Sequence, residues 1–131
     1  MPQHLFVYGT LKEGFRNFHI NRGQRIEGVF LTAAPHPLYL VGDFGLPWLL
    51  HRPGHGLQVE GQVFEVNETV LRDMDALERV DEPGYYERLP LQVLRIGDHQ
   101  SMVVACYFGS DATFERGPVI AGPLARYDLS H

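Results

Sequence analysis

The chain has 131 residues, the size of one domain, and we expect a single domain over residues 1–131. Hydrophobic residues make up 44% of it and charged residues 21%, ordinary values that exclude an intrinsically disordered protein. The formal net charge of −5 argues against nucleic acid as a partner, because such proteins neutralise phosphates with basic patches. The single cysteine, Cys106, excludes an intrachain disulfide framework and a cysteine-rich zinc site.

The pattern of apolar residues bears on location. The first residues, Met-Pro-Gln-His, lack the basic and apolar regions of a signal peptide. No apolar run approaches the roughly 18 residues that a membrane-spanning helix needs. We therefore expect a cytoplasmic monomer with no membrane partner.

Glycine and proline divide the chain into short segments, which favours strands and turns over long helices. A short helix is predicted over residues 17–25. The Gly97-Asp98 pair predicts a two-residue hairpin turn, and the chain after Phe108 is predicted to be loop. The apolar and alternating runs predict strands over residues 5–8, 26–32, 37–41, 47–50, 57–66, 86–96 and 100–108.

One segment has the pattern of an amphipathic helix, over residues 68–80. Asn67 is a residue type that caps helix N-termini, and Glu68 is favourable in the first turn. Pro83-Gly84 prevents continuation of the helix. Together these elements predict an α+β domain, a small and mostly antiparallel sheet or barrel with one principal amphipathic helix.

Within that helix, Glu78 is the carboxylate that points toward the apolar face. At 100° per residue it lies about 50° from the centre of the apolar stripe, whereas Asp73 and Asp75 lie about 90° or more away. Burial of a carboxyl group raises its pKa, which is how a general base that works near neutral pH is made. From periodicity alone, Glu78 is either such a base or a structural carboxylate, paired with an arginine or placed at a frayed helix end.

The loop after the first strand, Tyr8-Gly9-Thr10-Leu11, is a second candidate site. Gly9 at the end of a strand lets backbone amides approach a ligand, although a glycine there is also compatible with an ordinary tight turn. The loop is not a phosphate-binding P-loop, because it lacks the terminal Gly-Lys-Ser/Thr.

Other catalytic and metal-binding patterns are absent from the sequence. His51 and His55 are separated by Pro53 and Gly54, so no helix places both imidazoles on one face. The serines lie outside any Gly-x-Ser-x-Gly motif. Cys106 sits in an apolar run that is typical of a core thiol. We expect no metal and no cofactor.

Several segments together resemble the γ-glutamylcyclotransferase-like superfamily, and within it the γ-glutamylaminecyclotransferases. The segment Val7–Lys12 is similar to the family's Tyr-Gly-Ser/Thr-Leu signature, and Leu71–Glu78 is similar to the segment with its catalytic glutamate. The likeness covers nearly the whole chain, in order. The resemblance to the γ-glutamylaminecyclotransferases, the amine-releasing subgroup, is carried by residues 37–42, 46–51, 59–64, 86–88 and 122–127.

This resemblance implies a small β-barrel and cofactor-free cleavage of γ-glutamyl amides, such as γ-glutamyl-ε-lysine. The substrate's α-amine attacks its own γ-carbonyl, forming 5-oxoproline and releasing a free amine. The resemblance assigns the proton transfers to Glu78, and it assigns substrate binding to Tyr86, Arg88 and the loop, that is, Tyr8, Gly9, Thr10 and Leu11.

Two alternatives are compatible with the same resemblance. One is cleavage of γ-glutamyl amino acids or peptides, and the other is a non-catalytic small-molecule-binding domain. An inward Glu78 favours catalysis, because a binding domain has no need of a desolvated carboxylate. The segment Arg79–Tyr85 is a residue or two longer than the family pattern, and the resemblance places it beside the leaving group.

Overall fold

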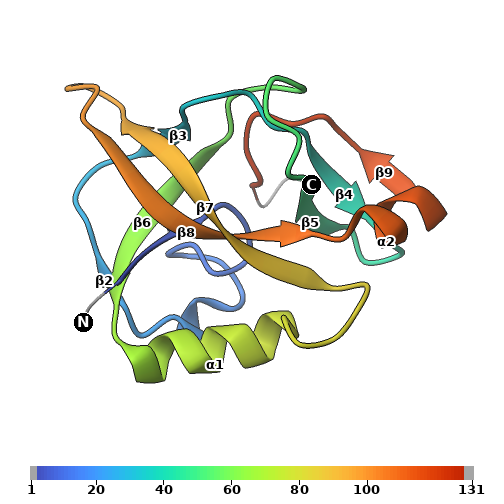
Figure 1. The fold of residues 1–131 in the computed structure, drawn as a ribbon, viewed down its shortest axis with the longest axis horizontal. Coiled ribbons are helices and arrows are strands. Elements are labelled where there is room, and N and C mark those ends of the chain that lie inside the picture. Colours follow the sequence, from blue (N-terminus) through green and yellow to red (C-terminus); the bar gives the residue numbers. More distant parts are fainter. Residues whose placement is uncertain (1–2, 129–131) are drawn as a thin grey trace.

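The protein is built around a closed β-barrel, seen in the computed structural model, which describes residues 3–128 (Figure 1). The strands are bonded in the order β1-β8-β7-β3-β6, and pairing of β6 with β1 closes the barrel. All of these pairs are antiparallel except β1–β8, so the predicted barrel of mostly antiparallel strands is confirmed. The barrel strands are β1 (Gln3–Val7), β3 (Phe30–Thr32), β6 (Glu60–Val66), β7 (Tyr86–Arg95) and β8 (Ser101–Gly109).

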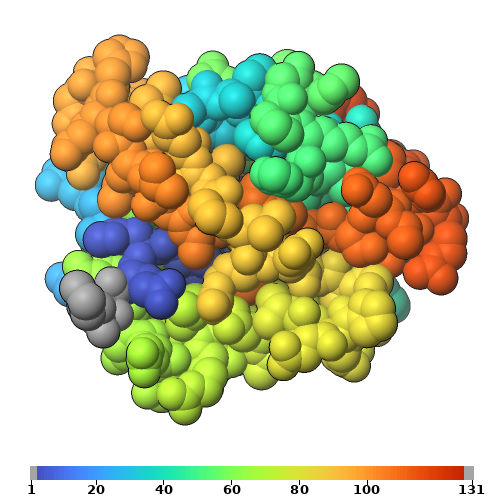
Figure 2. All heavy atoms as spheres, viewed as in Figure 1, coloured from blue at the N-terminus to red at the C-terminus, as the bar shows by residue number. Residues whose placement is uncertain are grey.

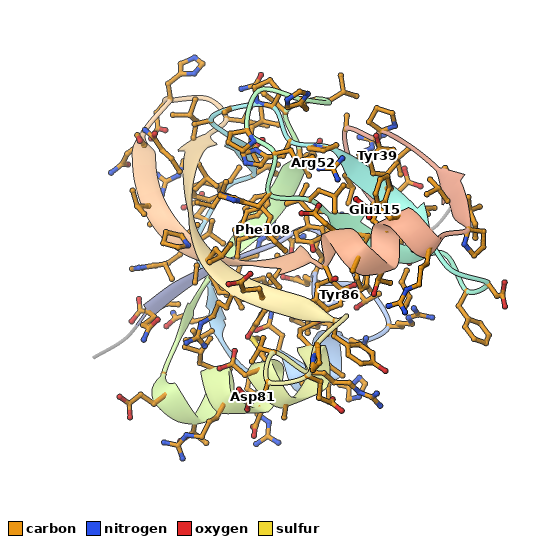
Figure 3. All side chains as sticks on the ribbon, turned by 45° about the vertical axis from the view of Figure 1, so that its right-hand side comes forward. Tyr39, Arg52, Asp81, Tyr86, Phe108 and Glu115 are labelled. Atoms are coloured by element: carbon orange, nitrogen blue, oxygen red, sulfur yellow. The ribbon has the colours of Figure 1, made fainter. Side chains whose placement is uncertain are left out.

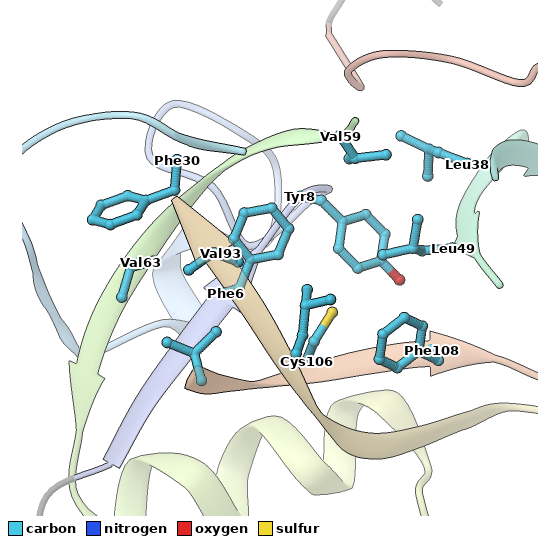
Figure 4. Packing of buried hydrophobic residues seen from close by; sticks show 12 residues of the cluster. Phe6, Tyr8, Phe30, Leu38, Leu49, Val59, Val63, Val93, Cys106 and Phe108 are labelled. Atoms are coloured by element: carbon cyan, nitrogen blue, oxygen red, sulfur yellow. The ribbon is translucent and has the colours of Figure 1, made fainter. Parts of the chain in front are cut away.

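The barrel interior is filled by side chains from alternate strand positions, as the two-residue period of a strand requires. Figure 4 shows Phe6, Phe30 and Phe108 packed together with Tyr8 and Cys106. Cys106 is fully buried there, as its apolar surroundings in the sequence predict. The interior is therefore a packed core.

Helix α1 (Glu68–Glu78) lies along one side of the barrel (Figure 1). The Asn67 side chain accepts a hydrogen bond of 2.9 Å from the amide of Val70, which confirms the predicted N-cap. The helix buries Val70, Leu71 and Met74 against the barrel. It ends at Glu78, two residues before the predicted end, because Arg79 adopts left-handed backbone angles (φ 55°, ψ 47°).

A second sheet, of β4 (Leu38–Val41), β5 (Leu46–Leu49) and β9 (Val119–Ala121), lies beside the barrel. Helix α2 (Asp111–Arg116) precedes β9, so the prediction of loop after Phe108 is wrong. The Ser110 side chain caps this short helix by accepting from the amide of Thr113. An element of six residues is too short to produce a recognisable helical period.

Three further predictions differ from the structure. In place of a helix over residues 17–25 there are a 3-10 helix, η1 (Phe18–Ile20), and strand β2 (Gln24–Arg25), which pairs with β6. The strands predicted to begin at residues 26 and 57 begin at Phe30 and Glu60. Residues 96–100 connect β7 to β8, a longer connection than the predicted Gly97-Asp98 turn. No helix within residues 3–128 is long and apolar enough to cross a membrane.

Candidate active site

A cavity of about 330 Å³ opens at the end of the barrel, where the loop after β1, the C-terminal end of α1, β5 and α2 meet. Six of the seven predicted site residues line it: Tyr8, Gly9, Thr10, Leu11, Glu78 and Tyr86. They come from segments about 70 residues apart in the chain. The fold therefore brings together the two candidates that the sequence presents separately, the glycine loop and the inward glutamate.

In the loop, the backbone carbonyl groups accept hydrogen bonds, whereas the backbone amides donate none to residues 3–128. The carbonyl oxygens of Gly9, Thr10 and Leu11 accept hydrogen bonds from Lys12 N, Asn17 N and Asn21 Nδ2, at 3.1, 2.9 and 3.1 Å. No hydrogen bond within residues 3–128 is donated by the amides of Gly9, Thr10 or Leu11. Unpaired amides beside a cavity are suited to bind a carbonyl oxygen or an anion.

The space around Gly9 explains why a glycine stands at this position. A Cβ built on Gly9 would lie 2.6 Å from Cγ and 3.2 Å from Cβ of Pro47, closer than side-chain carbons pack. The φ of Gly9 is not positive, so other residue types could adopt its backbone conformation. The close contact with Pro47 is what excludes a larger residue at this position. Glycine allows the loop to pack directly against β5.

Glu78 is the last residue of α1, and its partly buried side chain lines the cavity. Burial raises the pKa of its carboxyl group from the ordinary 4.5 to about 7. The carboxyl group forms no hydrogen bond or ion pair within the part of the chain that the structure describes. Near neutral pH it can therefore accept or donate a proton, which is what a general acid–base residue requires.

Aromatic side chains form much of the remaining wall. Tyr86 is placed between α2 and the end of α1 (Figure 3). Its hydroxyl donates to Pro47 O at 2.7 Å, and its ring packs on Trp48 with centroids 4.5 Å apart. The hydroxyl of Tyr8 donates to Tyr107 O at 2.6 Å. Burial raises the pKa of both tyrosines well above 10, so they stay neutral at physiological pH.

Arg88 does not line the cavity, unlike the other predicted site residues. Its guanidinium Nη1 donates to Asp75 Oδ2 at 2.5 Å, and Asp75 Oδ1 accepts 2.7 Å from the hydroxyl of Tyr107, a cavity residue. One interpretation of Glu78 was a structural carboxylate paired with an arginine. In the structure, Asp75 is the carboxylate of α1 that has this role. Arg88 is connected to the site through Asp75 and Tyr107.

Sequence reasoning missed several lining residues as site residues, among them Arg16, Asn17, Tyr107, Thr113 and Gly117. The last two lie in the segment predicted to be loop. Figure 2 shows this part of the chain at the surface, beside the segment that follows α1, and the Thr113 hydroxyl donates to Gly84 O at 2.6 Å. For Tyr107, the alternating pattern of its strand was the only feature of the sequence that indicated its orientation.

The charged residues that line the cavity are Arg16, Glu78 and Arg79. Within residues 3–128 there is no group of three or more histidine, cysteine, aspartate or glutamate side chains able to hold a metal ion. The chemistry that these residues can supply is proton transfer by one carboxyl group, hydrogen bonding by backbone amides and attraction of anions by guanidinium groups.

The chain is similar in sequence to known proteins over most of its length. Gamma-glutamylaminecyclotransferase of Homo sapiens is 38% identical over 123 residues, covering 84% of this chain and 79% of that protein. A putative gamma-glutamylcyclotransferase of Drosophila melanogaster is also 38% identical, over 112 residues that cover 82% of this chain and 68% of that one.

The solved structures give the same result for the fold. The crystal structure of an AIG2-like protein from Mus musculus superposes with a TM-score of 0.78 at 32% identity, covering 97% of this chain and 88% of that one. The model of the family described as gamma-glutamyl cyclotransferase, AIG2-like, matches residues 5–123. The resemblance noted in the sequence is thereby confirmed, and the chain belongs to the gamma-glutamyl cyclotransferase, AIG2-like family.

Proposed function

We propose that the protein is a γ-glutamylamine cyclotransferase that acts on γ-glutamyl amides such as γ-glutamyl-ε-lysine, without a cofactor. The α-amine of the γ-glutamyl group attacks its own γ-carbonyl carbon, and a carbon–nitrogen bond forms as the five-membered ring closes. The amide bond to the departing amine then breaks. The products are 5-oxoproline and a free amine, and no water is consumed.

Glu78 is assigned both proton transfers. The α-amine is an ammonium group at neutral pH, so it loses one proton before it attacks and a second as the ring amide forms. The departing nitrogen gains one proton as its bond breaks and a second as it becomes an ammonium group. A single carboxyl group can accept the first proton and donate it to the leaving nitrogen. The observation that carries this proposal is a partly buried carboxyl group with a pKa of about 7 that lines the same cavity as unpaired backbone amides.

The loop is assigned the γ-glutamyl group. The amides of Gly9, Thr10 and Leu11 are free to donate to it, and amides aimed at a carbonyl oxygen stabilise the negative charge that develops during attack. The loop is held in position from its other side, since its carbonyl oxygens are already bonded. Donors that need no reorganisation are the effective ones in catalysis.

The shape of the cavity contributes through conformation. The nucleophile and the electrophile belong to one flexible molecule, so a cavity that holds the ring-closing conformer supplies much of the rate acceleration. The walls of Tyr8, Trp48 and Tyr86 are suited to enclose the aliphatic part of a γ-glutamyl chain.

The test is incubation with γ-glutamyl-ε-lysine and separate measurement of both products. We expect 5-oxoproline and lysine in equal amounts. Glutamate in place of 5-oxoproline would mean hydrolysis and would contradict the proposed reaction. Tight binding of 5-oxoproline with no turnover of any γ-glutamyl amide would support the binding domain instead. The same assay is applied to Glu78→Gln. Its control is Glu68→Gln, which changes a glutamate at the exposed start of the same helix.

A further inference from the structure

The chain contains one lysine, Lys12, and this residue directly follows the loop to which substrate binding is assigned. Lysine side chains are rarely buried, yet Lys12 is only 8% exposed. Its ammonium group donates a hydrogen bond of 2.5 Å to Tyr127 O and lies 4.4 Å from the centre of the Phe15 ring. A buried cation is thus bound to a neutral carbonyl group 115 positions further along the chain.

The C-terminal segment, residues 124–127, is itself attached to both sheets. The amide of Leu124 donates to the carbonyl oxygen of Leu38 in β4, at 2.8 Å. The carbonyl oxygen of Ala125 accepts from the amide of Glu60 in β6, also at 2.8 Å. Two side chains of the segment also pack against the core of the barrel. The segment is therefore a firm support for any residue that bonds to it.

The hydrogen bonds that shape the loop come from nearby in the chain. The carbonyl oxygens of residues 9–11 are bonded to groups of residues 12–21. Local bonds of this kind set the conformation of the loop, whereas a fixed place relative to the sheets needs contacts of long range. Lys12 makes one bond of each kind, because its amide donates to Gly9 O at 3.1 Å and its ammonium group to Tyr127 O. Lys12 therefore connects the loop to the C-terminal segment.

We propose that Lys12 is a positioning residue for the cyclotransferase reaction, which holds the free amides of residues 9–11 in place by attaching the loop to the C-terminal segment. Amides stabilise the charge that develops during attack most effectively when they need not move to do so. Stability alone is a poor reason for an ammonium group here, because burial of a charge is costly and an apolar side chain of the same length fills the space. This inference rests on the proposed function.

Kinetics with γ-glutamyl-ε-lysine test the role of the ammonium group. Lys12→Met keeps the length of the side chain and removes the hydrogen bond to Tyr127 O. We expect kcat to fall about tenfold while KM stays within about twofold, since the loop amides act on the transition state. Each rate is divided by the folded fraction, measured by circular dichroism. Lys12→Arg retains a cationic donor and should recover part of the loss. Arg22→Gln is the control, because Arg22 is an exposed cation that does not line the cavity.

A double-mutant cycle tests the connection to the C-terminal segment. Tyr127→Ala removes the ring whose centre lies 5.7 Å from that of Phe15, so it loosens the same connection from the other side. We expect it to lower kcat, and to cause little further loss when combined with Lys12→Met. Independent effects would multiply, and that result would contradict the proposal. Where Lys12→Met does not fold, Lys12→Arg and Tyr127→Ala provide the comparison.

A spectroscopic measurement reports on Lys12 directly. Because the chain has one lysine, protein labelled with carbon-13 at the lysine ε-carbon gives a single side-chain resonance. Saturation with 5-oxoproline should shift it, since the ligand binds to the loop that Lys12 holds. An unchanged resonance at a 5-oxoproline concentration that inhibits turnover, or an unchanged kcat in Lys12→Met, would overturn the role of Lys12 and leave the cyclotransferase activity intact. No 5-oxoproline from γ-glutamyl-ε-lysine with the unmodified protein would refute the proposed function itself.

Discussion

Arg88 of β7 and Asp75 of α1 form an ion pair, with Nη1 of Arg88 2.5 Å from Oδ2 of Asp75. Asp75 lies three residues before Glu78 in the same helix. The second carboxylate oxygen of Asp75 accepts from Tyr107 of β8. One side chain thus connects the end of α1 to two barrel strands. These contacts hold the helix turn that presents Glu78 to the cavity.

Asp75→Asn tests this connection. The substitution preserves shape and removes the charge that pairs with Arg88, so we expect a loss of about 1–2 kcal/mol in the free energy of unfolding, measured with urea. We also expect a lower kcat, because Glu78 loses a restraint one turn away. Tyr107→Phe removes one hydrogen bond to the Asp75 carboxylate but leaves its ion pair with Arg88 in place, so it should cost less on both measures. Unchanged kcat in Asp75→Asn would show that Glu78 is positioned without this network.

The pH dependence of turnover follows from the raised pKa of Glu78. The carboxylate form accepts the proton, so kcat/KM should rise with pH along an acidic limb centred at about 7. Glu78→Gln should lower turnover at least about a hundredfold, as is typical of general acid–base residues. A limb centred near 4.5, the ordinary value for glutamate, would contradict a desolvated Glu78.

The same pKa predicts an effect on stability. Between pH 4.5 and about 7 the unfolded chain has lost the proton of Glu78 while the folded protein keeps it, so stability falls as pH rises through this range and is fully lowered above it. Glu78→Gln removes this penalty. We expect the variant to gain roughly 3 kcal/mol over the unmodified protein between pH 4 and pH 8, measured by urea unfolding. A gain that does not change with pH would contradict the ionisation.

The contact between Gly9 and Pro47 makes a separate prediction. In Gly9→Ala the new methyl would meet the Pro47 ring at 2.6 Å, so the loop or β5 has to shift and turnover should fall severely, with Gly9→Val at least as damaging. Pro47→Ala in the same chain should restore part of the activity by removing Cγ. Thr10→Ser should be nearly neutral, because it retains the hydroxyl that accepts from Asn17. Full activity of Gly9→Val would place the site elsewhere.

Removal of metal ions by chelation tests whether the proposed reaction needs a metal. Proton transfer by Glu78 and charge stabilisation by backbone amides need no metal ion, so turnover should survive exhaustive treatment with EDTA. The measurement is the rate of 5-oxoproline release before and after chelation. Loss of activity that one added divalent metal restores would require a different mechanism.

The sequence by itself was sufficient to predict a mostly antiparallel sheet or barrel, the principal helix with its Asn67 cap, and an inward Glu78. Each depends on a local period or a short-range preference, and these are visible along the chain. Local patterns were less reliable at the ends of elements. The left-handed Arg79 ended α1 early, and the short α2 was missed because Ser110 and six helical residues make no clear period.

Only the tertiary structure decided which residues share the cavity. Glu78 and the Tyr8–Leu11 loop meet because side chains of β1 and the buried face of α1 share one hydrophobic cluster on the outside of the barrel, although they are far apart in sequence. Tertiary packing also pairs Arg88 with Asp75, and it places Pro47 so close to residue 9 that a glycine is needed there. Burial and partnership depend on what surrounds a side chain in space, and that is set by the closed barrel rather than by its neighbours in the chain.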